Sequence, residues 1–219
     1  MAINYSGERT IFTYKDEIEY ILPEILPEVS YVYLTSMGDN FSKTYDEVVG
    51  LVKNKPEVKL VFNPGSRQIR AGLEKIRNVL DVSYMVYINR EEAEKISGFG
   101  DSRGKEKELL GKVSALGPEV PVITDGPNGS FSLFEGKFYK AGVMPVDAYE
   151  RTGAGDAFGS GCLSALIKGK DITEAMLWGT VNSASVIGYI GAQRGLLKED
   201  EMATWLDRAK SSNVKVEEI

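Results

Sequence analysis

The chain of 219 residues contains no histidine and a single cysteine. The absence of histidine excludes every His-dependent catalytic triad and most zinc sites, so carboxylates are the leading candidates for a general base. One cysteine cannot form an internal disulfide, which favours a reducing, cytoplasmic environment. Cys162 falls within a predicted helix, where we expect it to be a small buried apolar side chain.

Long apolar runs and an excess of positive charge are missing as well. No stretch is long enough to span a bilayer and residues 1–10 lack a signal-peptide pattern, so we expect no membrane partner. The 26 basic and 32 acidic residues give a formal net charge of −6, which argues against a nucleic-acid partner. A hydrophobic share of 42% in a chain of this length is sufficient for one large domain.

Short apolar runs alternate with segments of helical spacing along most of the chain. The runs at residues 29–35, 58–63, 82–89 and 120–124 predict strands, and the segments 41–54, 66–80 and 102–116 predict helices. This alternation predicts a doubly wound α/β fold with a largely parallel sheet and helices on both faces. Ligands of such a sheet bind beyond the carboxyl ends of its strands.

The remaining segments predict a hairpin, a helical end and an unusual beginning. Residues 131–134 and 138–143 form the hairpin, a further strand precedes Glu150, and helices cover 155–168, 172–190 and 198–210. The polar tail from Ser211 is expected to be loose. Residues 3–5 and 10–14 predict two short strands rather than a buried first strand.

The most informative run is residues 151–161, which read RTGAGDAFGSG. It places the small residues Gly153, Ala154 and Gly155 at the start of a helix, where unpaired N–H groups favour an anion. Asp156 follows directly, so a carboxylate stands beside the anion site. Phosphoryl transfer needs both a cradle for the transferred charge and a base near the attacking hydroxyl. A glycine-rich turn capped by aspartate is the structural alternative.

Two further motifs follow predicted strands. Asn89-Arg90-Glu91-Glu92 has the spacing of a helix N-cap with a capping box. Residues 124–129, with the sequence TDGPNG, have the composition of a type I or II turn. Both motifs are therefore open to a purely structural interpretation.

The run at 151–161 resembles the C-terminal signature of the ribokinase-like (PfkB) carbohydrate kinases, whose usual form is D-T-x-G-A-G-D-x-F. The resemblance implies ATP-dependent phosphoryl transfer to a hydroxyl of a sugar or a related small molecule. Asp156 would take the hydroxyl proton, and the N–H groups of Gly153, Ala154 and Gly155 would stabilise the transferring phosphoryl. Glu150 and Arg151 stand where the family commonly has Asp and Thr, a departure that bears on the family's monovalent-cation loop.

The same resemblance assigns roles to the other motifs. N-x-x-E is similar to the family motif in which a glutamate, here Glu92, helps to place Mg²⁺ through water, with Asn89 beside it. The motif T-x-G-x-x-G is similar to the loop that contacts nucleotide phosphate, which implicates Thr124, Gly126 and Gly129. Further along, Asn182 falls in the region that lines the family's adenine pocket, and Gly191 lies near the monovalent-cation loop.

The resemblance covers Met1 to about Lys210 and lacks the family's N-terminal third, including its Gly-Gly substrate loop. It implies remnant lid strands at residues 1–14 and a nucleotide-binding core at residues 15–219. Two alternatives stay open: a nucleoside kinase of the same family, and a non-catalytic nucleotide-binding remnant or interaction protein. The expected partners are a nucleotide and a sugar-like acceptor of unspecified identity. The oligomeric state stays open, and a homo-oligomer is one alternative, because a lid that has lost strands exposes edges and apolar surface, which favours association.

Overall fold

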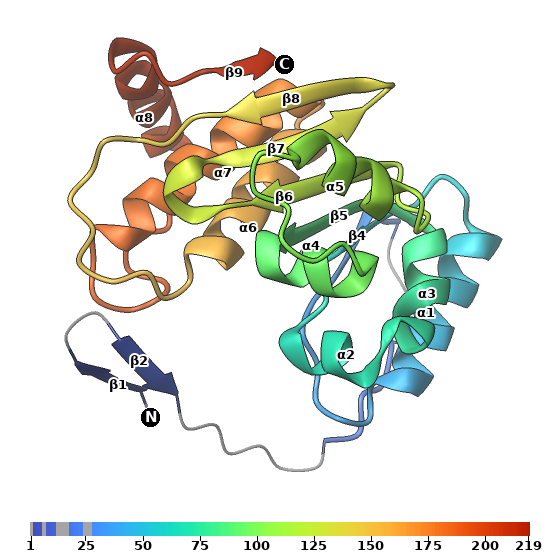
Figure 1. Ribbon diagram of the computed structural model, residues 1–219. Helices are drawn as coiled ribbons and strands as arrows, with labels where there is room; N and C mark the ends of the chain where they lie inside the picture. The colour runs from blue at the N-terminus through green and yellow to red at the C-terminus, as the bar shows by residue number, and fades with distance from the viewer. Residues whose placement is uncertain (1, 6–7, 12–17, 24–27) are drawn as a thin grey trace.

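A mixed seven-stranded sheet forms the centre of the computed structural model, which describes residues 2–5, 8–11, 18–23 and 28–219 (Figure 1). The first four strands are parallel, and the last three run antiparallel to their neighbours. The strand order follows the sequence: β3 (Tyr31–Leu34), β4 (Lys59–Phe62), β5 (Ser83–Asn89), β6 (Val120–Thr124), β7 (Ser130–Phe134), β8 (Lys137–Ala141) and β9 (Val216–Glu218).

Helices cover both faces of this sheet (Figure 1). One face carries α1 (Phe41–Asn54), α2 (Ser66–Ala71), α3 (Leu73–Asp81), α4 (Arg90–Ser97) and α5 (Glu106–Ser114). The other face carries α6 (Ala154–Ile167) and α7 (Ile172–Ile187), with α8 (Glu199–Ser211) packed on α7. The predicted doubly wound α/β fold is confirmed, with a parallel core and an antiparallel edge.

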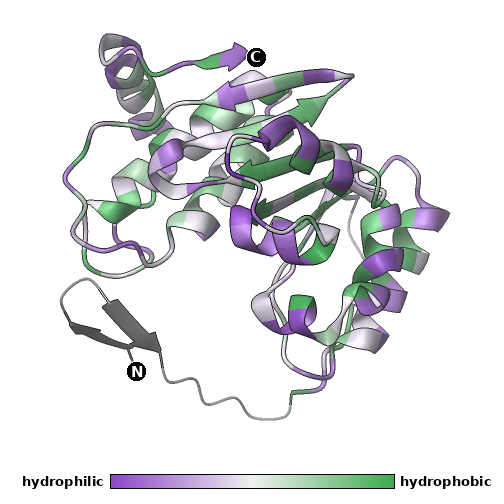
Figure 2. Ribbon diagram, viewed as in Figure 1, coloured by the Kyte–Doolittle hydropathy of each residue, from purple (hydrophilic) through white to green (hydrophobic). Residues whose placement is uncertain are grey.

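Alternating side chains of the strands supply the two cores. Leu60 and Phe62 of β4 pack into the core beneath α1–α5, whereas Val61 between them packs against α6 and α7. Strands β5 and β6 are largely buried on both faces, and much of the two strands is coloured as hydrophobic in Figure 2. Continuous apolar strands of this kind are typical of a parallel sheet covered on both sides.

Several predicted boundaries are corrected by backbone geometry. The helix predicted at 66–80 is divided at Gly72, whose φ of 106° is incompatible with helix, into α2 and α3. The helix predicted at 102–116 begins only at Glu106, because a loop with glycines in the left-handed region precedes it. The strand predicted directly before Glu150 is wrong, because residues 142–150, between β8 and Glu150, are irregular. The tail is not loose, since β9 pairs with β8.

The first residues form a separate antiparallel pair of strands. Strand β1 (Ala2–Tyr5) pairs with β2 (Glu8–Ile11), and within the described residues neither joins the seven-stranded sheet. This confirms two strands at the beginning of the chain, although residues 12–14 of the second predicted strand lie outside the described residues. Their assignment as lid remnants stays a prediction. In the described part of the chain, no helix combines the length and apolarity required to cross a bilayer.

Candidate functional site

A cavity of about 470 Å³ lies at the carboxyl ends of β5 and β6. The parallel register places Asn89, the last residue of β5, beside Thr124, the last residue of β6. Ser130 at the start of β7 pairs with Thr124 from the other side. The opposite wall comes from the start of α6, from α7 and from the irregular segment 142–151.

The structure brings most of the predicted site residues together in this one cavity. Those that line it are Asn89, Thr124, Gly126, Gly129, Ala154 and Gly155. Gly153 and Asp156 flank the last two on the first turn of α6. Three motifs whose cavity-lining residues lie up to 66 positions apart in sequence therefore converge on the carboxyl edge of the sheet, as the fold class predicts.

The first turn of α6 is shaped by glycine. Gly153 is the N-cap residue, with φ 82°, and no side chain caps the helix. A Cβ at Gly153 would lie 2.7 Å from the Cβ of Ala192, so this backbone packs directly against the loop after α7. Gly155, in contrast, borders the cavity, and apart from its own helix backbone no atom of the described residues lies within 4 Å of an ideal Cβ there. The helix start thus presents bare backbone to the cavity, an arrangement that favours an anion.

Asp156 is exposed on this turn and lies near the buried Tyr87 and the partly buried Tyr33. The hydroxyl groups of Tyr33 and Tyr87 hydrogen-bond to each other, and Tyr87 packs against Gly159 of α6. Burial raises the pKa of both tyrosines, and the negative charge of Asp156 raises it further. Both phenols therefore stay neutral beside the carboxylate.

Asn89 and Glu92 form a complete capping box at the start of α4. The Asn89 Oδ1 accepts from the Glu92 amide at 2.9 Å, and the Glu92 Oε2 accepts from the Asn89 amide at 3.0 Å. Burial raises the pKa of Glu92, partly offset by the hydrogen bond from the Asn89 amide. Among the described residues, no group of three or more potential metal ligands exists. Magnesium bound with phosphates needs only one or two carboxylates, and a single half-buried Glu92 fits that requirement.

The turn at residues 124–129 is closed by its own backbone. The Asp125 amide donates to the Gly129 carbonyl at 2.8 Å, and the Asn128 amide donates to the Asp125 carbonyl at 2.9 Å. Gly129 has φ 91°, and a Cβ there would lie 2.0 Å from the Ala141 carbonyl oxygen, so only glycine fits. The structural interpretation of this motif as a turn is confirmed, and the same turn forms part of the cavity wall.

Asn182 and Gly191 lie outside the cavity lining. The buried Asn182 amide donates to the Ala157 carbonyl at 2.7 Å, and its Oδ1 accepts from the Leu197 amide at 2.9 Å. The Gly191 amide donates to Glu150 at 2.9 Å. Asn182 therefore links α6 to the loop after α7, and Gly191 links that loop to the irregular segment before α6.

Several residues in the cavity wall carry almost no signal in the sequence. The Ser130 hydroxyl is buried there without a hydrogen-bond partner among the described residues. Its position directly after the T-x-G-x-x-G motif is the available signal. Val143, Ser183 and Ile187 also line the cavity. The sequence predicts a strand of the hairpin around Val143 and a helix around Ser183 and Ile187, and neither segment carries a polar pattern that marks a site.

Comparisons with known proteins agree with this architecture. Residues 1–199 match the family described as pfkB family carbohydrate kinase. A ribokinase of Haemophilus influenzae is 28% identical over 166 residues, covering 74% of this chain and 52% of the relative. A nucleoside kinase of Thermoplasma acidophilum is 25% identical over 177 residues, covering 80% and 54%. The chain thus spans about half the length of these relatives.

One solved structure illustrates the likeness of the folds. The Arabidopsis thaliana ribokinase complexed with ribose and ATP superposes with a TM-score of 0.69 at 19% identity. The match covers 81% of this chain and 55% of that one. At this identity the comparison establishes the fold.

Proposed function

The chain belongs to the PfkB family of carbohydrate kinases, and we propose that it binds ATP with Mg²⁺ and transfers the γ-phosphoryl group to a hydroxyl of a sugar or a related small molecule. One observation carries the proposal: the uncapped first turn of α6 and the turn at residues 124–129 face the same cavity. The amides at the start of α6 on one side, and Thr124 with the glycine turn after it on the other, suit a polyphosphate, whose charge is spread over several oxygens.

The cavity lining combines polar and apolar groups, which suits a nucleotide. Thr124, Ser130 and the bare backbone of Gly155 are among its polar groups. Val143 and Ile187 belong to the apolar wall, where a base would bury its faces. Asn182 and Gly191 would act on the nucleotide indirectly, through the loop that they hold.

Glu92 is the residue that we assign to Mg²⁺, with Asn89 beside it. The metal, when bound, would neutralise charge on the phosphates. The capping box holds one carboxylate oxygen of Glu92 against the Asn89 amide, which restricts where the carboxylate can lie. A contact through water requires no third protein ligand.

Asp156 is the proposed general base. It would accept the proton of the acceptor hydroxyl while that oxygen forms the new bond to phosphorus and the bond to the leaving ADP breaks. The α6 amides would hold the charge that develops on the phosphoryl oxygens. The neutral pair Tyr33 and Tyr87 adds no competing base nearby.

A second candidate function is nucleotide binding without transfer. One observation favours it: Asp156 is exposed. Catalysis requires the acceptor in near-attack geometry and the exclusion of water, so an uncovered base is a poor catalyst.

One experiment distinguishes the two functions. The 219-residue chain is titrated with MgADP by calorimetry and then assayed for ADP formation from ATP with a panel of sugars and nucleosides. Kinase activity predicts acceptor-dependent turnover that Asp156→Asn lowers by about 10²–10⁴-fold with MgADP binding unchanged. Binding without any turnover supports the second function. Absence of both MgADP binding and turnover refutes the proposed site.

A further inference from the structure

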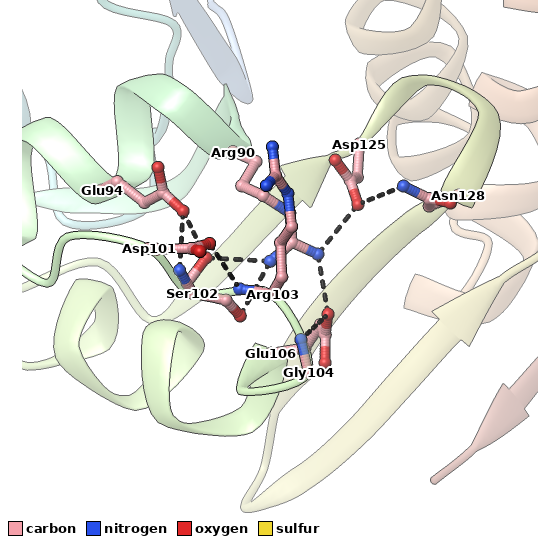
Figure 3. Close-up of polar contacts among 9 residues, drawn as sticks. All are labelled: Arg90, Glu94, Asp101, Ser102, Arg103, Gly104, Glu106, Asp125 and Asn128. Carbon is pink, nitrogen blue, oxygen red and sulfur yellow. Dashed lines mark hydrogen bonds and ion pairs between the residues drawn. The ribbon is translucent and has the colours of Figure 1, made fainter.

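A buried arginine lies between two of the motifs that form the cavity. Arg90 is the first residue of α4, directly after Asn89, and is 8% exposed. Its Nη2 donates to Glu106 and to Asp125, both at 2.8 Å (Figure 3). Its Nη1 donates to the carbonyl and to the hydroxyl of Ser102, at 3.0 and 2.8 Å.

The partners of Arg90 come from three segments, which it connects to the start of α4. Asp125 belongs to the turn at 124–129, and its Oδ2 also accepts from the Asn128 side chain at 3.0 Å. Glu106 begins α5 and accepts from the Gly104 amide at 3.1 Å. Ser102 lies in the glycine-containing loop 98–105 and donates from its amide to Glu94 of α4 at 2.9 Å. Figure 3 shows these groups converging on the guanidinium group.

We propose that Arg90 is the positioning residue of the phosphate-binding turn: it fixes Asp125, and with it the cavity-lining backbone of Gly126 and Gly129, and it neutralises the carboxylates beneath the phosphates. The inference rests on the proposed function, because it concerns the same cavity. Arg90 makes four hydrogen bonds from its planar guanidinium group, one more than the three N–H donors of a lysine ammonium allow, so lysine is not an equivalent replacement.

Charge is the second part of the argument. The side chains of Asp125 and Glu106 are only 16% and 24% exposed, so water screens them poorly. Burial lowers the pKa of Arg90, but its hydrogen bonds to Asp125 and Glu106 outweigh that effect and raise it overall. Without the cation, two carboxylates would repel the phosphates and each other. The Phe131 ring, with its centroid 5.6 Å from the guanidinium carbon, adds a cation–π contact.

The test compares Arg90→Met and Arg90→Lys with the wild-type chain and with the control Arg77→Met. Arg77 forms an exposed ion pair with Asp81 on α3, far from this network. Dissociation constants are measured for MgADP and for adenosine, and amide hydrogen exchange is measured at Asn128 and Gly129. We expect both Arg90 variants to bind MgADP about tenfold or more weakly, with adenosine binding and the Arg77 variant within about twofold of wild type.

The outcomes separate this inference from the proposed function. If the wild type binds MgADP no better than adenosine, the proposed phosphate site is refuted. If the wild type binds MgADP more tightly than adenosine and both folded Arg90 variants keep this difference in affinity, only the role of Arg90 is refuted. An equal loss of MgADP and adenosine affinity would also refute it, because it indicates general damage. If Arg90→Met does not fold, the Arg90→Lys variant tests the proposal, because lysine keeps the positive charge but lacks the planar set of guanidinium donors. Faster exchange at Asn128 and Gly129 in the folded variant supports the positioning of the turn, and unchanged exchange contradicts it.

Discussion

Replacing Gly155 by alanine separates the stability of α6 from its proposed contact with phosphate. Gly155 is the second residue of α6, its φ is negative, and apart from its own helix backbone no atom of the described residues lies within 4 Å of an ideal Cβ there. Alanine at a compatible helical position stabilises a protein by about 0.4–1 kcal/mol. We therefore expect the free energy of unfolding of the ligand-free chain to rise by roughly that amount.

The same methyl group should weaken nucleotide binding. Gly155 borders the cavity, and a phosphate must approach the backbone to hydrogen-bond distance, about 2.9 Å. A methyl group there displaces the anion and removes at least one charge-assisted hydrogen bond, worth about 1.5–3 kcal/mol. The expected increase in the dissociation constant of MgADP is roughly ten- to hundredfold.

Gly153→Ala is the matched control, because it should damage stability and binding together. Its left-handed backbone disfavours alanine by about 1–2 kcal/mol. The new Cβ would also meet the Cβ and Cα of Ala192 at 2.7 and 2.8 Å. Overpacking of that kind adds about 1–3 kcal/mol. The loop after α7 would have to move away from the start of α6.

Urea unfolding without ligand and calorimetric titration with MgADP measure both quantities. The decisive result is the behaviour of Gly155→Ala. If that variant is as stable as expected and binds MgADP with wild-type affinity, the first turn of α6 is not the phosphate site. A loss of stability in Gly155→Ala would instead contradict the open space that the structure shows around an added Cβ at Gly155.

Three further predictions concern other parts of the site and the fold. Glu92→Gln should weaken the Mg²⁺ dependence of nucleotide binding more than binding without metal, and an unchanged magnesium titration would leave Glu92 as part of a cap only. Ser130→Ala should leave ligand-free stability equal or up to about 1 kcal/mol higher, because a buried unbonded hydroxyl is removed. It should also weaken MgADP binding roughly two- to tenfold; Ser132→Ala, another buried unbonded hydroxyl but outside the cavity lining, should not affect binding. Asp171 accepts from the Glu174 amide and the Thr173 hydroxyl, which lowers its pKa below 3.8. Asp171→Ala should therefore cost about 1 kcal/mol in urea unfolding at pH 7, and the difference should shrink as the pH falls below 3.8 and the wild-type carboxylate is protonated; a difference independent of pH would contradict this.

The fold was largely predictable because its core strands and helices carry strong periodicity. The predicted helix at 41–54 and the strand at 120–124 match α1 and β6 to the residue. The errors fall where backbone geometry or a distant partner decides. Gly72 interrupts a helical pattern through its φ, which spacing does not reveal. Strand β9 forms because β8 offers an open edge 75 residues earlier in the chain, whereas its own sequence is polar.

The site was predictable only as far as its backbone motifs. The glycines and Asp156 stand in sequence runs, so their spacing could be recognised. Ser130, Ile187 and Arg90 gain their positions from tertiary packing. Arg90 in particular occupies an unspecified position of N-x-x-E, and its partners Ser102, Glu106 and Asp125 come from three later segments.

The structural and functional interpretations of these motifs are not competitors. A capping box, a glycine turn and a helix start are each local solutions for backbone groups that lack partners. Those same groups are what an anion requires, so the spacing of one motif cannot separate the two interpretations. What favours function is convergence: Asn89, Thr124, Gly129 and Gly155 lie on different elements and face one cavity. Caps and turns with a purely structural role would satisfy their backbone groups equally well if each of them faced a different part of the surface.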